Sequence, residues 1–111
     1  MNDALNAALE DLRKLFPNKS TSWIRRCMLR LKDVKPVFAS RNVEQWIVRG
    51  NAKLGDRFKI YIVTLYPRER KSFCSCYAPQ RKFNIKRMKM TCTHVGAVYL
   101  YKLVQKWRCK E

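Results

Sequence analysis

Several features common in enzymes and secreted proteins are missing from this sequence. Its 111 residues include one histidine and three glycines. We find no carboxylate pair and no glycine-rich phosphate loop, so nothing favours an enzyme or a small-molecule substrate. The opening segment, M-N-D-A-L-N-A-A-L-E-D-L, carries acids and lacks the basic start and apolar core of a signal peptide. No run approaches the roughly 20 apolar residues that a membrane-spanning helix needs.

Acidic residues are also scarce. Lys and Arg number 25 against 8 Asp and Glu, which gives a formal net charge of +17. Such an excess favours a polyanionic partner, of which nucleic acid is the commonest, although it also occurs simply as a source of solubility. Binding to an anionic membrane would call for a basic amphipathic segment with a large aromatic face, and we see none. The charge therefore predicts a nucleic-acid partner and no membrane.

The five cysteines are an odd number, which fits a disulfide framework poorly. Without a signal peptide we expect an intracellular protein, in the cytoplasm, nucleoid or nucleus and not secreted, whose thiols stay reduced. Cys27 falls within the apolar stripe of a predicted helix, and we interpret it as a small buried hydrophobic residue. Cys109 follows the last predicted helix and should be exposed. The remaining three cysteines lie within one short segment of the sequence.

These three cysteines and the only histidine lie in two closely spaced pairs, Cys74-Ser75-Cys76 and Cys92-Thr93-His94. Three thiolates and one imidazole complete the tetrahedral ligand set of a structural zinc ion. The alternatives are ordinary buried cysteines beside an incidental histidine, or an iron–sulfur cluster. Mixed sulfur and nitrogen ligation favours zinc, and four protein ligands leave no open position for catalysis. We therefore predict one structural Zn²⁺ at Cys74, Cys76, Cys92 and His94.

Apolar spacing predicts helices at both ends of the chain. Residues 2–16 form one amphipathic pattern, and a second helix begins near Ser20 and ends at Pro36. These two should form a helical hairpin. The apolar residues that follow His94 predict a third helix, which runs to about Trp107.

Between the helices the sequence predicts strands. Residues 43–49 and 57–66 are rich in β-branched and aromatic side chains and are joined by turn residues, as an antiparallel β-hairpin requires. In a further extended segment, alternation would place Cys74 and Cys76 on one face, toward one ion. The fold class is therefore α+β: an N-terminal helical hairpin, an antiparallel β-hairpin, a zinc-clamped loop and a C-terminal helix. We expect the N-terminal helices to pack on the strands.

The motif and the elements around it resemble the SWIM zinc-binding domain, whose signature is C-x-C-x(n)-C-x-H. Cys-Ser-Cys and the later C-T-H-V-G-A-V-Y-L carry the resemblance, with Trp46-Ile47-Val48 and Tyr61-Ile62-Val63 similar to the strand pair that precedes it. It covers about residues 40–107 and implies a ββα zinc fold that binds DNA or protein. We accordingly divide the chain into a helical hairpin, 1–39, and a SWIM-like zinc domain, 40–111, expected to form one compact unit. The basic, fairly long spacer departs from many family members.

The spacer between the two ligand pairs is basic and contains no acid. Zinc at both of its ends would present these bases on a fixed platform, where they could follow phosphates while an aromatic ring stacks or wedges. The alternative is a solvated loop whose apolar residues fold back onto the hairpin. The predicted nucleic-acid-binding residues are Arg81, Lys82, Phe83, Lys86, Arg87 and Lys89.

Two functions follow from these observations. The first is a small basic zinc protein that binds nucleic acid, DNA more than RNA, largely through phosphate contacts. The second is a protein-interaction adaptor in DNA recombination or repair, which docks a recombinase paralogue or a similar partner. Apolar residues expected on the surface, such as Leu29 and Trp107, motivate the second. We expect no enzymatic activity from either.

Overall fold

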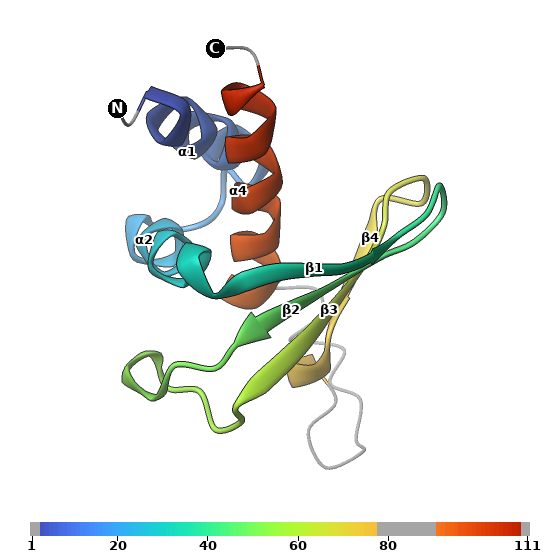
Figure 1. The fold of residues 1–111 in the computed structure, drawn as a ribbon. Helices are drawn as coiled ribbons and strands as arrows, with labels where there is room; N and C mark the ends of the chain where they lie inside the picture. The colour runs from blue at the N-terminus through green and yellow to red at the C-terminus, as the bar shows by residue number, and fades with distance from the viewer. Residues whose placement is uncertain (1–2, 78–90, 110–111) are drawn as a thin grey trace.

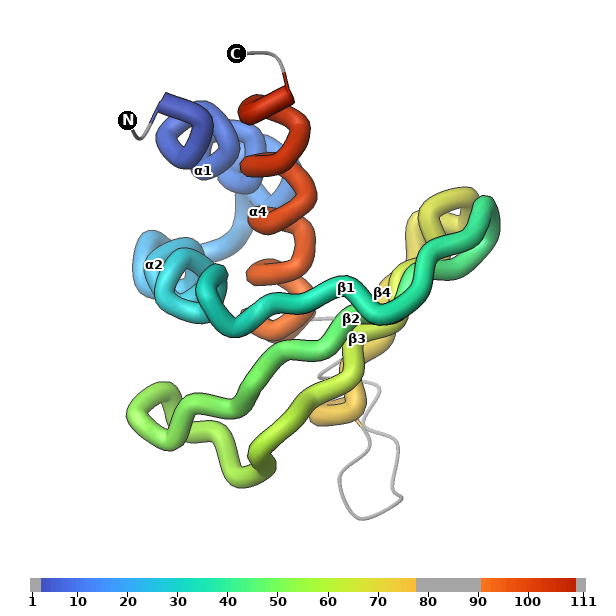
Figure 2. Tube along the Cα trace, viewed as in Figure 1, coloured from blue at the N-terminus to red at the C-terminus, as the bar shows by residue number. Residues whose placement is uncertain are grey.

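The computed structural model describes residues 3–77 and 91–109. Over these residues the fold is α+β, as predicted, with three α-helices and one four-stranded antiparallel sheet. In Figures 1 and 2 the helices gather on one side of the sheet. The elements are α1 (Asp3–Leu15), α2 (Thr21–Arg30), β1 (Val34–Ala39), β2 (Glu44–Arg49), β3 (Ile60–Tyr66), β4 (Lys71–Cys74) and α4 (Thr93–Arg108). Short 3-10 turns occupy Leu31–Asp33, Ala52–Leu54 and Ser75–Tyr77.

The predicted helical hairpin is present as α1 and α2. Ser20 caps α2, because its side chain accepts a hydrogen bond from the Trp23 amide. The buried faces of both helices meet α4 rather than the sheet: Leu12 of α1 and Ile24 of α2 share a cluster with Leu100 of α4. The expectation that these helices pack on the strands is therefore wrong. No described helix has the length and apolar character needed to cross a membrane.

Helices α2 and α4 approach closely at Gly96. A Cβ atom placed there would lie 2.4 Å from the Cys27 sulfur and 2.6 Å from the Trp23 ring. The contact therefore requires glycine, since real atoms do not approach so closely. Cys27 is fully buried, which confirms its interpretation as a core residue. Burial, with the nearby Cys92, raises the pKa of its thiol to about 12.

The sheet has the strand order β1-β2-β3-β4. The predicted β-hairpin is confirmed as β2 and β3, which pair with Ile47 opposite Ile62. Of the two outer strands, β4 ends within the further extended segment predicted at Cys74, and β1 was not predicted. The second predicted helix ends earlier than expected, because β1 begins at Val34 and includes Pro36. A strand at the edge of a sheet tolerates proline, since one row of its amides needs no partner.

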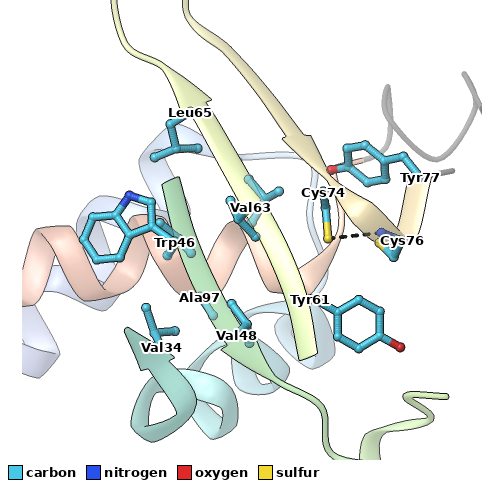
Figure 3. Close-up of a cluster of buried hydrophobic side chains, with 12 residues drawn as sticks. Val34, Trp46, Val48, Tyr61, Val63, Leu65, Cys74, Cys76, Tyr77 and Ala97 are labelled. Atoms are coloured by element: carbon cyan, nitrogen blue, oxygen red, sulfur yellow. Dashed lines mark hydrogen bonds between the residues drawn. The ribbon is translucent and has the colours of Figure 1, made fainter. Parts of the chain in front are cut away.

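The inner face of the sheet packs on α4. Val48, Val63 and Ala97 belong to one buried cluster between the sheet and this helix (Figure 3). The same helix contributes Leu100 and Val104 to the second cluster, with α1 and α2. Helix α4 is therefore covered by the sheet on one side and by helices on the other, and its first residues lie where the two halves of the fold meet.

Candidate metal centre

The four predicted ligands come together at one point of the fold. Cys74 ends β4, Cys76 lies in the turn Ser75–Tyr77, Cys92 precedes α4, and His94 lies in its first turn. Their ligand atoms all lie within 4.8 Å of one another. Cys74, Cys76 and His94 are buried, and Cys92 is partly buried. The cluster could hold one metal ion, and its three sulfurs and one nitrogen are consistent with zinc.

The backbone places the first cysteine pair differently from the prediction. Only Cys74 belongs to a strand, and Cys76 lies in a 3-10 turn. The turn brings the Cys76 backbone amide within 3.5 Å of the Cys74 sulfur (Figure 3). The prediction that both cysteines lie on a strand is thus wrong.

The crowding of three thiols favours a bound cation. Hydrogen bonds with Cys76 and Cys92, together with burial, raise the pKa of Cys74 far above its usual value. Burial also opposes ionisation of Cys92, but hydrogen bonds from Cys74 and Cys76, together with the nearby His94, outweigh it and lower the pKa of Cys92. Without a cation the site therefore disfavours three thiolates together. A divalent ion removes this conflict, because it binds thiolates and offsets their mutual repulsion.

The histidine ring is oriented for a metal. Its Nε2 lies 3.0 Å from Oδ1 of Asp56, while its Nδ1 is buried and has no hydrogen-bond partner among the described residues. An ionised carboxylate can only accept a hydrogen bond, so Nε2 carries the proton and Nδ1 keeps a lone pair. The Tyr61 ring stacks on the imidazole, with centroids 4.0 Å apart, and fixes its plane. Nδ1 is therefore the nitrogen that would bind zinc.

Asp56 is itself held by a buried network. Arg30 donates to its carboxylate through both terminal nitrogens, with the Nη2 bond at 3.0 Å. The backbone N–H of Asn51 donates to the same carboxylate at 2.8 Å. The Arg30 and Asp56 side chains are only 2% and 5% exposed. Burial tends to raise the pKa of Asp56, but the hydrogen bonds from Arg30 and Asn51 outweigh it, and the pKa is lowered. The carboxylate thus stays charged beside the histidine.

This network also joins separate elements to the site. Arg30 ends α2, and its Nε donates to Oγ1 of Thr93, 2.9 Å away at the start of α4. Asp56 belongs to the connection between β2 and β3, where Gly55 adopts a φ of +88° that favours glycine. A carboxylate behind a metal-binding histidine fixes the ring and raises its basicity. Sequence reasoning missed Arg30 and Asp56, and a search for an acid to support His94 is the signal that could have found Asp56.

The ends of the spacer are held as well. The Tyr77 hydroxyl accepts a hydrogen bond from the Cys92 amide at 3.1 Å, and the Thr91 carbonyl accepts one from the Trp23 indole at 3.1 Å. Tyr77 is fully buried, and this burial raises the pKa of its hydroxyl. Both anchors lie beside the metal ligands. The predicted nucleic-acid-binding residues Arg81, Lys82, Phe83, Lys86, Arg87 and Lys89 lie outside the described residues.

Comparison with known proteins adds no relative. No protein-family model matches the chain, and neither a curated protein nor a solved structure matches it. The structure contains a Cys₃His cluster compatible with a zinc-binding motif. The SWIM resemblance rests on the motif and on the order of the elements around it.

Proposed function

We propose that this chain is a SWIM-like zinc module that binds nucleic acid, with DNA favoured over RNA. One structural Zn²⁺ at the Cys₃His cluster holds the sheet, the spacer ends and α4 in a fixed arrangement. Four protein ligands fill a tetrahedral site, which supports a structural role for the metal and not a catalytic one. The observation that carries the proposal is the net charge of +17.

Three of the eight acids are engaged in contacts within the fold. Asp56 is enclosed in the metal-site network, and Asp11 accepts a hydrogen bond from the Trp107 indole at 2.8 Å. Glu44 accepts two from Lys102, at 2.9 and 3.0 Å. Asp56 and Glu44 each pair with one cation, Arg30 and Lys102, so these contacts leave the net charge of +17 unchanged. The exposed surface therefore presents an excess of cations to phosphate.

The proposal is tested by fluorescence anisotropy with duplex DNA, single-stranded DNA and RNA over a series of salt concentrations. A phosphate-binding protein loses affinity with salt, by about 0.9 units of log–log slope for each duplex phosphate contacted. A chelated sample runs alongside, and we expect removal of zinc to unfold the centre and abolish binding together. Absence of binding at low salt, or binding that does not change with salt, would contradict the proposal.

The spacer is tested by replacing its bases as a group, since neighbouring cations could compensate for a single loss. We expect glutamine at Lys86, Arg87 and Lys89 to weaken binding and to lower the salt slope by up to about 3 units. A matched control removes the same charges from exposed positions on α1 and α4. It carries glutamine at Lys14, Lys106 and Arg108. Equal effects of the two triple variants would argue against the spacer as the contact surface.

A protein-interaction adaptor is a second candidate, and the open face of the sheet favours it. Ile60 and Ile62 of β3 are 55% and 48% exposed, and Phe58 lies close by and is also exposed. Leu29 is exposed as well, whereas Trp107 is partly covered and donates to Asp11. A nuclease-treated pull-down that recovers a defined partner would support the adaptor.

The control for the pull-down is a variant with Ile60→Asp and Ile62→Asp. This change adds charge to the exposed face and leaves the buried face of β3 intact, so it should abolish recovery of the partner without unfolding the protein. Recovery that survives the double substitution would exclude the sheet face as the docking surface.

A further inference from the structure

A cavity of about 590 Å³ lies beside the metal centre, between the first turns of α2 and α4. Cavities of this size accommodate small ligands or parts of larger ones. The predicted ligands Cys92 and His94 line it, and the other lining residues belong to both halves of the fold. They include Lys19, Ser20, Trp23, Arg26, Arg30 and Thr93.

Two cations at the cavity are not matched by an acid. The Lys19 ammonium lies 5.2 Å from the centre of the Trp23 ring, and the Arg26 side chain donates to the Leu54 carbonyl. Each contact holds its cation in place and leaves the positive charge uncompensated. Asp56 is the one acid among the described residues that line the cavity, and Arg30 pairs with it. Lys19, Arg26 and Arg30 contribute three positive charges, against one negative charge on Asp56 and one on a zinc-loaded Cys₃His centre, so the cavity keeps a net positive charge.

Two hydroxyl groups on the wall can donate hydrogen bonds. Thr93 Oγ1 accepts from Arg30 Nε at 2.9 Å, and Ser20 Oγ accepts from the Trp23 amide at 3.1 Å. A hydroxyl that accepts one bond keeps its own proton to donate. Cations and hydroxyl donors that line one cavity are the groups that recognise a phosphate oxygen.

We propose that this cavity binds one phosphate of a nucleic-acid strand. Lys19 and Arg26 supply the charge, while Ser20 and Thr93 orient the oxygens. The proposal rests on the proposed function and deepens it, because it assigns part of the nucleic-acid interface to α2 and to the turn before it. It also links binding to zinc, since Cys92 and His94 form part of the same cavity.

The test is a pair of double variants with equal net charge, measured by anisotropy on the full zinc-loaded chain. The cavity variant carries Lys19→Gln and Arg26→Gln. The control carries Lys14→Gln and Arg25→Gln, at exposed positions that do not line the cavity. Loss of one phosphate contact should lower the log–log salt slope by about 0.9, which corresponds to about eightfold weaker binding at 0.1 M salt. The control should stay within about twofold of wild type by the same reasoning.

Two further arms separate a local effect from misfolding and identify the source of the phosphate. Lys19→Arg with Arg26→Lys keeps both charges and should bind nearly as well as wild type, with an unchanged melting temperature. Inorganic pyrophosphate should compete with DNA for wild type, and this competition should be lost in the cavity variant.

Each contrary outcome identifies what has failed. Equal weakening by the cavity and control variants would overturn the cavity assignment and leave nucleic-acid binding standing. A wild-type chain that binds pyrophosphate but no nucleic acid at low salt would overturn both the proposed function and a nucleic-acid source for the phosphate.

Discussion

Replacement of Asp56 by asparagine tests the network behind the metal centre. The side chain accepts four hydrogen bonds: two from Arg30, one from the Asn51 amide and one shared with His94 Nε2. Asparagine has nearly the same shape but no charge. Its carbonyl oxygen can still accept from His94 Nε2 and Arg30 Nη2, while its NH₂ group would then face two donors, Arg30 Nη1 and the Asn51 backbone amide.

We expect Asp56→Asn to lower both the zinc affinity and the free energy of unfolding. Removal of a carboxylate behind a metal-binding histidine lowers metal affinity by about 10- to 100-fold, or about 1.4 to 2.8 kcal/mol. The Arg30 side chain is 2% exposed and would lose its counter-ion. Breaking a buried pair in this way costs about 3–5 kcal/mol of unfolding free energy. Asp56→Asn combined with Arg30→Met removes both charges, so we expect it to regain most of the stability but not the zinc affinity.

Zinc affinity is measured by competition with a chromophoric chelator, and stability by urea unfolding of the zinc-loaded protein. Glu69→Gln is the matched control, because it removes one acid from an exposed turn and should change neither quantity. A zinc affinity for Asp56→Asn within about twofold of wild type, against the expected 10- to 100-fold loss, would refute the supporting role of this carboxylate.

Three further predictions concern the packing of the helices on α4 and the accessibility of two cysteines. Gly96→Ala should cost about 1–3 kcal/mol in urea unfolding, because its methyl group would overlap Cys27 and Trp23, and an added Cys27→Ala should recover part of the loss. Leu12→Ala should cost about 2–5 kcal/mol in the same assay, since its fully buried side chain fills the cluster on α4. Iodoacetamide at neutral pH should modify the exposed Cys109 in the native protein and leave Cys27 unmodified, as mass spectrometry can show.

The Cys₃His cluster could be predicted from the sequence because its members occur as two closely spaced pairs. Short spacing guarantees that the members of each pair are near one another, so only one long-range contact has to be inferred. The strands β2 and β3 were predictable for a similar reason, since a short connection joins two runs of β-forming residues. Both inferences depend on local sequence.

The residues that support the site could not be predicted in this way. In its local sequence Asp56 is a typical turn residue after Gly55. Arg30 is one of several bases on a predicted helix. They meet His94 only because the connection after β2, the end of α2 and the start of α4 converge in the fold. Pro36 misled the prediction for another reason: proline usually ends a helix, but an edge strand also tolerates it. The support of His94 by Asp56 and Arg30 and the strand at Pro36 both depend on tertiary structure, which the local sequence does not show.

X-ray absorption spectroscopy of the zinc-loaded protein tests the central claim most directly. We expect one zinc per chain with three sulfur ligands at about 2.3 Å and one nitrogen ligand at about 2.0 Å. Those ligands are the thiolates of Cys74, Cys76 and Cys92 and the imidazole of His94. A shell of four sulfurs, or one in which oxygen replaces a sulfur, would contradict it.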